Sequence, residues 1–455
     1  MHAQATTLTA SGQDLHPHRR IWAIAGPAIL ANISGPLVGI VDTWALGHLP
    51  DPRFLGAIAV GSFVFHFVYW SLGFLRMGTT GLAAQAFGQG DADLSREILL
   101  RSLGLGLAFA GLILVLQAPI LAGLFLLLDP SPETAGLALA YCRIRIWAVP
   151  AILLRIAVIG FLVGTQRVRL ALLVEVALNL VNAALTVLFV ARLGLGIEGA
   201  GLASLMAEIF AGALALAIAF RVIGLRAALA TLRSVEFRRA AAFGRLLSVN
   251  GYIFLRTLFL QLAFALLWRV SAGLGPLTLA ANQVLIQFLM LTSFGLDGFA
   301  YAAEALVGAA KGRRNRSYFT QTVRLTTLWA MVAAGLYCLG YFAFGHSIIA
   351  AFTDLEAVRE AAGAHLIWLA AMPVLSVWSY QLDGIFIGAT ETRAMMLTML
   401  AALLAYAAAL ASLVPAFGNH GLWAAMAVFL AARGLGLGLA YPRLARNIAS
   451  PAGSR

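Results

Sequence analysis

Asp42 is the residue of this sequence whose type and position best indicate chemistry. It lies near the C-terminal end of an apolar segment that also contains Pro27 and Pro36. A carboxylate inside a membrane span costs about 2.5–3.5 kcal/mol on insertion scales, so a span that keeps one generally uses its charge or its proton. Because prolines interrupt helical hydrogen bonds, we interpret Pro27 and Pro36 as hinges and predict ion-coupled transport through Asp42.

Two later apolar segments carry polar residues at helical spacing. Asn179, Asn182 and Thr186 are three and four residues apart, so they form one stripe along a helix. Ser204 and Glu208 form a second stripe on the following segment. Inside a membrane such groups must face one another, an ion or a cavity.

Acidic residues in other spans have competing interpretations. Asp297 and Glu304 lie on one helix face because they are seven residues apart, and each could bind substrate or pair with an arginine. For Asp383, a substrate role and a gating role are equally open. The basic residues within the spans are expected to serve mainly as partners for acids: Arg76, Arg143, Arg145, Arg155, Arg256 and Arg433.

Glu175 and the cysteines suggest structural roles. Glu175 lies near the start of the fifth span, where we expect it to pair with Arg167 or Arg169. Cys142 and Cys338 match no disulfide or metal-ligand spacing, so we predict no firm metal site and no cofactor beyond a coupling ion.

The elements that must position these residues are long apolar helices. Of the 455 residues, 61% are hydrophobic and 11% are charged, whereas soluble domains carry about 25% charged residues. A segment of about 20 apolar residues can cross a hydrocarbon core about 30 Å thick. The sequence therefore predicts an all-α integral membrane protein with twelve transmembrane helices, approximately 21–46, 55–86, 98–127, 134–163, 169–191, 197–222, 243–272, 277–310, 321–350, 358–388, 394–416 and 420–442.

The distribution of basic residues predicts the orientation. If the N-terminus is inside, most Lys and Arg residues outside the spans fall on the cytoplasmic side, and the outer turns hold Arg53, Arg192, Arg269 and Arg359. By the positive-inside rule both termini are cytoplasmic. We therefore expect a multi-pass protein of the bacterial inner (plasma) membrane, and we assign its net charge of +12 to topology rather than to nucleic-acid binding.

The chain divides into two similar halves around a basic segment. At an offset of 224 residues, Gly160-Phe-Leu-Val-Gly164 matches Gly384-Ile-Phe-Ile-Gly388, and at an offset of 222 Gly90 matches Gly312. Parallel repeats of six spans are typical of transporters that hold substrate between their halves. The predicted parts are a cytoplasmic tail (1–20), an N-lobe (21–222), a basic linker (223–242), a C-lobe (243–442) and a second tail (443–455).

Four motifs occur in order across the two halves. They are Val41-Asp-Thr43 with Gly47-His-Leu49, Phe74-Leu-Arg-Met-Gly-Thr-Thr-Gly-Leu82 with Gln85, Asp297-Gly-Phe-Ala-Tyr-Ala-Ala-Glu-Ala-Leu-Val-Gly308, and Asp383-Gly-Ile-Phe-Ile-Gly-Ala-Thr390. From about residue 20 to 445 the chain resembles the multidrug and toxic compound extrusion (MATE) family, in its DinF-like branch. The resemblance implies two pseudo-symmetric six-helix lobes around a cavity that opens alternately to either side. It also implies export of amphipathic, often cationic compounds in exchange for Na⁺ or H⁺, with Asp42 carrying the ion and its helix bending at Pro27.

The chain departs from this resemblance at Thr186, where many relatives carry a second acid. A dehydrated Na⁺ prefers compensating anionic charge, whereas a lone carboxylate in a low-dielectric cavity is readily protonated. We therefore favour H⁺ coupling, with Asn182, Thr186 and Ser204 supplying further oxygens and Na⁺ at Asp42 and Asn182 as the alternative. Candidate substrate-cavity residues are Phe63, Met77, Arg256, Asp297, Glu304 and Asp383. We expect a monomer that binds small amphipathic molecules and the bilayer.

Other function classes fit the sequence less well. A flippase of a lipid-linked or amphipathic metabolite is the alternative within transport, although such proteins usually have additional helices and a strongly cationic cavity. An intramembrane enzyme is not expected, because the sequence lacks Asp-x-x-x-Asp, His-Glu-x-x-His and Gly-x-Ser-x-Gly patterns. A passive channel is disfavoured by the two-lobe repeat, which contains no pore loop.

Overall fold

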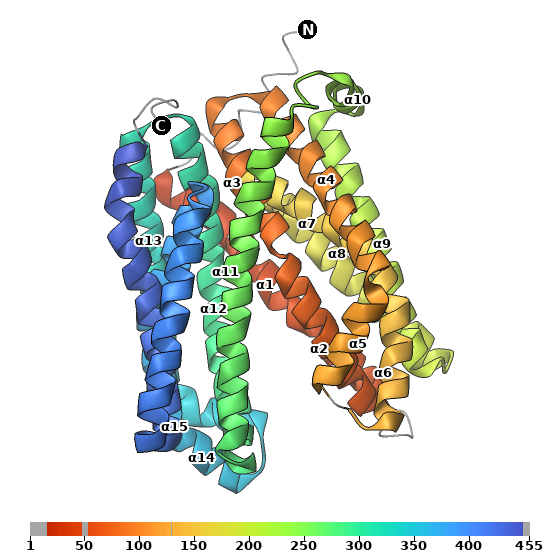
Figure 1. Ribbon diagram of the computed structural model, residues 1–455, viewed down its shortest axis with the longest axis vertical. Coiled ribbons are helices and arrows are strands. Elements are labelled where there is room, and N and C mark those ends of the chain that lie inside the picture. The colour runs from red at the N-terminus through yellow and green to blue at the C-terminus, as the bar shows by residue number, and fades with distance from the viewer. Residues whose placement is uncertain (1–15, 48–52, 129, 449–455) are drawn as a thin grey trace. The chain divides into compact units, whose positions relative to one another are not determined.

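The regular structure of this protein is helical. A computed structural model describes residues 16–47, 53–128 and 130–448, and within these ranges it contains no strand (Figure 1). Each of the twelve predicted spans lies within helical segments. The prediction of an all-α membrane protein is therefore confirmed.

Ten α-helices and two short helical segments make up the described part of the first half of the chain. Short 3₁₀ and π segments, Ile146–Ala148 and Val187–Arg192, extend two of its helices. The helices are α1 (Pro17–Gly47), α2 (Arg53–Leu72), α3 (Phe74–Gln89), α4 (Ala92–Val115), α5 (Gln117–Leu128), α6 (Pro132–Arg145), α7 (Val149–Gly164), α8 (Val168–Thr186), α9 (Gly196–Ile223) and α10 (Leu225–Arg233).

The second half is built from fewer, longer helices. These are α11 (Ala240–Gly273), α12 (Pro276–Gly312), α13 (Arg316–Phe352), α14 (Glu356–Gly388) and α15 (Thr392–Asn447). The backbone leaves the helical region at Gly418 (φ 56°, ψ −129°), which divides α15 into the last two predicted spans. A positive φ of this kind is accessible to glycine at no steric cost.

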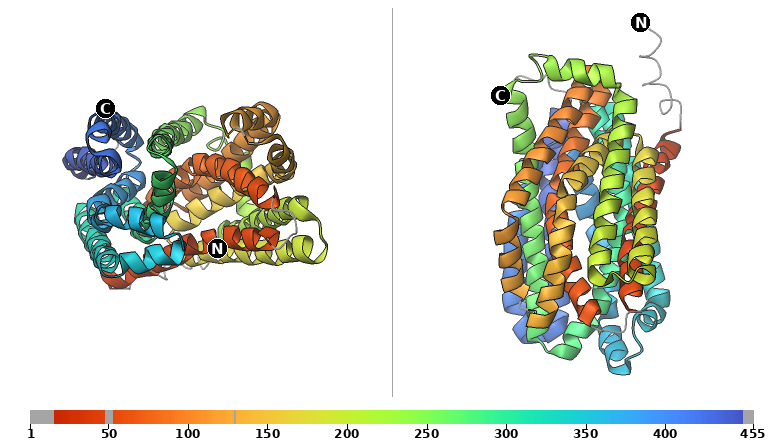
Figure 2. Two further views of the ribbon diagram at one scale, coloured as in Figure 1. Left: turned by 90° about the horizontal axis from the view of Figure 1, so that it is seen from below. Right: turned by 90° about the vertical axis from the view of Figure 1, so that its right-hand side faces the viewer.

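The chain forms two compact units, and in each of them the helices run side by side as a bundle (Figure 2). The N-terminal unit consists of Leu30–Asn250, and the C-terminal unit consists of Met1–Ile29 together with Gly251–Arg455. Two helices, α1 and α11, are thus each divided between the units. The lobe boundaries at residues 222 and 243 stay a prediction.

The turns that follow equivalent helices repeat their backbone conformation at an offset of 224 residues. After α3 and α12, Gly90 (φ 72°) and Arg314 (φ 52°) adopt the left-handed conformation. The next residues, Asp91 and Asn315, each accept a hydrogen bond of 2.8 Å from the backbone N–H three positions on, which caps α4 and α13. The expected match of Gly90 with Gly312 is therefore wrong, because the residue that precedes the cap must adopt the left-handed turn, and in the second half that residue is Arg314.

The same offset relates two close contacts between helix backbones. A Cβ on Gly160 of α7 would lie 2.5 Å from the Arg76 carbonyl oxygen of α3. A Cβ on Gly384 of α14 would likewise lie 2.5 Å from the Ala300 carbonyl oxygen of α12. Small residues let membrane helices approach backbone to backbone, so the predicted internal repeat is present in the packing as well as in the sequence.

Candidate functional site

The polar stripe on α8 faces its neighbouring helices in the N-terminal unit. Asn179 donates a hydrogen bond of 2.8 Å from Nδ2 to Oγ of Ser34 on α1. The Ser34 hydroxyl in turn donates to the carbonyl oxygen of Ala31. This contact fixes the second half of α1 against the middle of α8.

Asn182 forms the next contact along the stripe. Its Nδ2 donates to Oγ of Ser204 on α9 at 3.2 Å, and both residues are buried. Asn182 Oδ1 is also buried but has no hydrogen-bond partner in the described part of the chain. A buried carbonyl oxygen without a partner is costly, and it is the acceptor that a protonated carboxyl group or a small cation would use. Thr186, one turn further, is fully buried.

Asp42 and Pro36 lie in α1, but their side chains are outside the described residues, as is His48. The predicted contact of Asp42 with Asn182, Thr186 and Ser204 therefore stays a prediction. The structure does bring Asn182 and Ser204 together, as the spacing on two neighbouring spans implied.

A buried ionic cluster joins α7, α8 and α9. Arg155 of α7 donates to both carboxylate oxygens of Glu208 (Nε to Oε2 3.0 Å, Nη2 to Oε1 3.2 Å) and also pairs with Glu175. The predicted pairing of Glu175 with Arg167 or Arg169 is wrong. The carboxylate instead meets a guanidinium that is itself buried between helices, whereas the Arg169 side chain is exposed. The sequence does not identify Arg155 as the bridge between Glu175 and Glu208. These residues are far apart in the chain, and only tertiary packing brings them together.

A second buried cluster, in the C-terminal unit, has the opposite composition. Asp383 Oδ2 of α14 accepts from Arg433 Nη2 of α15 at 2.7 Å and also from Arg256 Nη2 of α11. The first cluster has two carboxylates for one guanidinium, and this one has two guanidiniums for one carboxylate. The Nε atoms of both arginines are buried without hydrogen-bond partners in the described structure. Asp383 and Arg256 therefore meet, as an ion pair.

The other cavity candidates are spread over both units. Phe63 of α2 is exposed and Met77 of α3 is half-buried, both in the N-terminal unit. In α12, Ser293 donates to Asp297 at 3.3 Å, and Glu304 is buried. Among the described residues no cluster of three or more His, Cys, Asp or Glu side chains could hold a metal ion.

Comparison with known proteins covers nearly the whole chain. The model of the family described as MatE matches residues 27–188 and 253–411. The chain is 37% identical to "DNA damage-inducible protein F" of Escherichia coli over 94% of this chain and 93% of that protein. It is 28% identical to "Probable multidrug resistance protein NorM" of Rhizobium meliloti, over 94% of each.

Solved structures show the same fold. An outward-facing structure described as a multidrug resistance MATE family transporter of the MOP superfamily superimposes with a TM-score of 0.85 and covers 96% of this chain and 97% of its own. The sequence identity is 21%, so this likeness shows the fold alone. It includes both halves of the chain.

Proposed function

The chain belongs to the MatE family, whose members are transporters and not enzymes, and from this premise we propose that it is a cation-coupled multidrug efflux antiporter that works by alternating access. The names of its relatives support export of drugs and other small xenobiotics. We further propose that amphipathic, often cationic compounds are its substrates. Both termini would lie in the cytoplasm, and H⁺ rather than Na⁺ would drive export.

The observation that carries this proposal is Oδ1 of Asn182. This buried acceptor on the polar stripe of α8 has no hydrogen-bond partner among the described residues, and the same stripe faces α1. As the first and fifth spans, α1 and α8 run in the same direction, and the contact of Ser34 with Asn179 sets their register. Asp42 is eight residues beyond Ser34, and Thr186 is seven beyond Asn179. At about 1.5 Å per residue, this register supports placing Asp42 level with Thr186 and about one turn from Asn182.

The composition of this site favours a proton. Thr186 offers a hydroxyl where a second carboxylate would strengthen Na⁺ binding, so Asp42 would be the one formal charge at the coupling position. A protonated Asp42 can donate to the free acceptor of Asn182, whereas the deprotonated form attracts a cationic substrate. One proton that enters down 100 mV releases about 2.3 kcal/mol, which supports roughly fifty-fold accumulation of substrate.

The proposed cycle uses the two prolines of α1. Pro27 and Pro36 have no backbone N–H, so each of them removes one helical hydrogen bond from α1. The boundary between the two units, at Ile29 and Leu30, falls between these prolines. Protonation of Asp42 from outside would let α1 bend there and shrink the cavity. Substrate would leave, and the proton would be released after the cavity opens to the cytoplasm.

The decisive experiment is efflux from proteoliposomes with a pH gradient and a Na⁺ gradient imposed separately. Wild-type protein should respond to the pH gradient, and Asp42→Asn should abolish transport while leaving the protein folded. Asp354→Asn, at an exposed acid in a surface ion pair, is the matched control and should transport normally. Undiminished efflux by Asp42→Asn would overturn the scheme.

One observation favours the alternative, a flippase of a lipid-linked or amphipathic metabolite. Arg256 and Arg433 outnumber Asp383 in the buried cluster of the C-terminal unit, and their buried Nε donors have no hydrogen-bond partner among the described residues. An anionic group would satisfy this excess of positive charge. Competition assays separate the two functions. An anionic lipid analogue should inhibit a flippase, and a cationic drug should inhibit the antiporter.

A further inference from the structure

Helix α10 presents a face that the described part of the protein does not cover. It follows the membrane span α9 after a sharp turn at Gly224 (φ 79°). Ala228 and Thr231 are buried in the N-terminal unit, where α10 packs on α4 and α9. The side chains of Leu225, Leu229 and Leu232 remain 56%, 50% and 40% exposed. This apolar surface therefore begins where a membrane span ends.

The exposed residues of α10 are sorted by type around the helix. At about 100° per residue, the three leucines fall within about 60° of arc. Arg226 and Arg233 lie together about 80° to one side of them, and the buried pair, Ala228 and Thr231, lies about 100° to the other side. Alanines occupy the face opposite the leucines. Apolar, basic and small residues thus occupy separate faces, which is the pattern of a helix that lies in a membrane interface.

The arginines around α10 are available to a partner. In the described part of the chain, no hydrogen bond, ion pair or ring contact engages the guanidinium groups of Arg221, Arg226, Arg233, Arg238 or Arg245. All five side chains are exposed. The one acid of this segment, Glu236, is 3.9 Å from Arg239. The surface therefore carries a large excess of positive charge.

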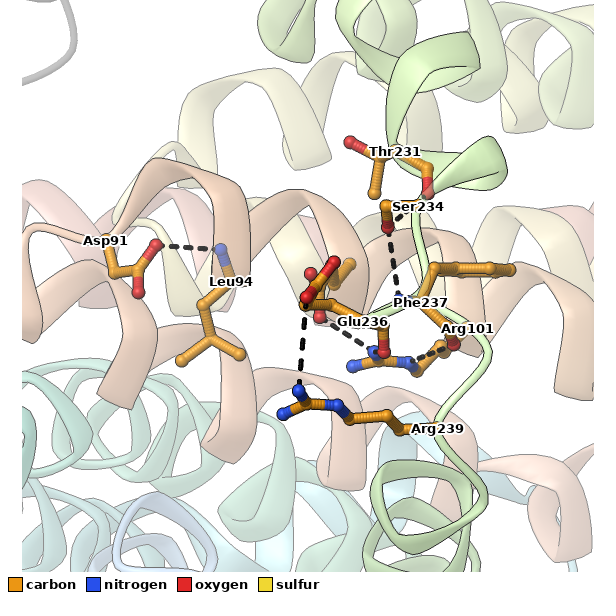
Figure 3. Close-up of polar contacts among 9 residues, drawn as sticks. Asp91, Leu94, Arg101, Thr231, Ser234, Glu236, Phe237 and Arg239 are labelled. Atoms are coloured by element: carbon orange, nitrogen blue, oxygen red, sulfur yellow. Dashed lines mark hydrogen bonds and ion pairs between the residues drawn. The ribbon is translucent and has the colours of Figure 1, made fainter.

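A clasp holds the segment after α10 against α4 (Figure 3). Arg101 of α4 donates to the carbonyl oxygens of Glu236 (2.7 Å) and Phe237 (3.2 Å), and it pairs with Glu97 at 2.7 Å. Ser234 accepts from the backbone N–H of Phe237 at 3.1 Å, which closes the turn after α10. Arg101 is itself buried in α4, so these hydrogen bonds hold the C-terminal end of α10 against a membrane span. The leucines of α10 therefore stay at the level where that span ends.

From these observations we propose that α10 lies in the membrane interface, with its three leucines among the acyl chains and its arginines on the phosphates of anionic phospholipids. Each Lys or Arg near an anionic surface strengthens binding about fivefold. Nucleic acid would also attract the arginines, but it offers no apolar surface to the leucines, whereas the bilayer that α9 spans meets this stripe where the span ends. The proposal depends on the membrane location of α9 and not on the coupling ion, so it can fail without affecting the transport proposal.

The test measures the depth of two positions on α10 in full-length protein reconstituted into liposomes. Cys142→Ala and Cys338→Ser remove the native thiols, and Leu229→Cys or Ala230→Cys then carries one environment-sensitive dye. A nitroxide on the lipid chains should quench the dye at position 229 more strongly than at 230, and aqueous iodide should show the reverse order. Exchange of phosphatidylcholine for phosphatidylglycerol should enlarge this difference.

Charge variants then test the role of the arginines. In the Leu229→Cys protein, Arg226→Gln with Arg233→Gln should lower the ratio of inserted to free α10 about twenty-five-fold. Arg192→Gln, at the opposite end of the span α9, removes an exposed charge of the same kind and should change nothing. Equal iodide quenching at both positions in every lipid mixture would overturn the proposal. Protection of position 229 by DNA or heparin in place of lipid would overturn it as well.

Discussion

Gly164 of α7 lies directly against the backbone of Thr80 in α3, so that a Cβ on the glycine would be 2.6 Å from the Thr80 carbonyl oxygen. The equivalent pair in the second half, 224 residues on, is Gly388 of α14 against Glu304 of α12. With Gly160 and Gly384 one turn earlier, the equivalent pair of helices in each half is in backbone contact at two successive turns. We expect these pairs to be the most rigid part of each unit.

Gly164→Ala and Gly388→Ala should each destabilise the protein. Their new methyl groups meet backbone atoms, which cannot rotate away, and overpacking of this kind costs about 1–3 kcal/mol. Gly104→Ala in α4 and Gly335→Ala in α13 are matched controls, because nothing lies within 4 Å of a Cβ at either position. Thermal unfolding in detergent provides the comparison. Equal midpoints for all four variants would show that the close approach has no energetic consequence.

Arg155→Gln should be strongly destabilising. The change leaves the carboxylates of Glu208 and Glu175 buried without their guanidinium, and removal of one partner of a buried pair typically costs about 3–5 kcal/mol. Adding Glu208→Gln should recover part of the loss. Arg96→Gln, which breaks the pair with the exposed Asp93, should cost about 0–1 kcal/mol. An Arg155→Gln protein as stable as Arg96→Gln would contradict the importance of the cluster.

Asp383→Asn tests whether the cluster of the C-terminal unit is structural. The variant leaves Arg256 and Arg433 facing each other without a shared carboxylate, and we expect a similar loss of about 3–5 kcal/mol. Adding Arg433→Gln to Asp383→Asn should recover part of that loss, because only the buried guanidinium of Arg256 then lacks a carboxylate. If the folded double variant also shows normal efflux, Asp383 has no substrate role. A selective rise in the KM for drug would instead assign it one.

Thr186→Asp tests the proposal that the coupling ion is a proton. The variant adds a second carboxylate near the proposed position of Asp42, and a dehydrated Na⁺ is stabilised by that charge. We expect efflux by this variant to respond to a Na⁺ gradient, and we expect efflux by wild-type protein not to respond to it. Thr186→Ser keeps the hydroxyl and should retain proton dependence. Absence of Na⁺ dependence in a folded, active Thr186→Asp protein would argue that this position does not contribute to ion selection.

The sequence alone determined the class of this protein and the location of its helices. Apolar length limits what can cross a bilayer, so each predicted span coincides with helical segments, and even the division of α15 at Gly418 was visible as two apolar runs. The internal repeat could also be predicted from the sequence. Gly160 and Gly164 recur as Gly384 and Gly388, and in the structure these glycines lie where two helix backbones touch.

Only the tertiary structure decided which charges meet. Hydropathy places Arg155, Glu175 and Glu208 inside the membrane, but the pairing depends on how three helices rotate about their axes, which a helical period does not specify. For this reason Glu175 was predicted to pair with its sequence neighbours and instead pairs with Arg155. The same packing leaves the leucines of α10 exposed, and it leaves Oδ1 of Asn182 without a hydrogen-bond partner among the described residues. The sequence determines which polar groups enter the membrane, and the packing decides which of them remain available for function.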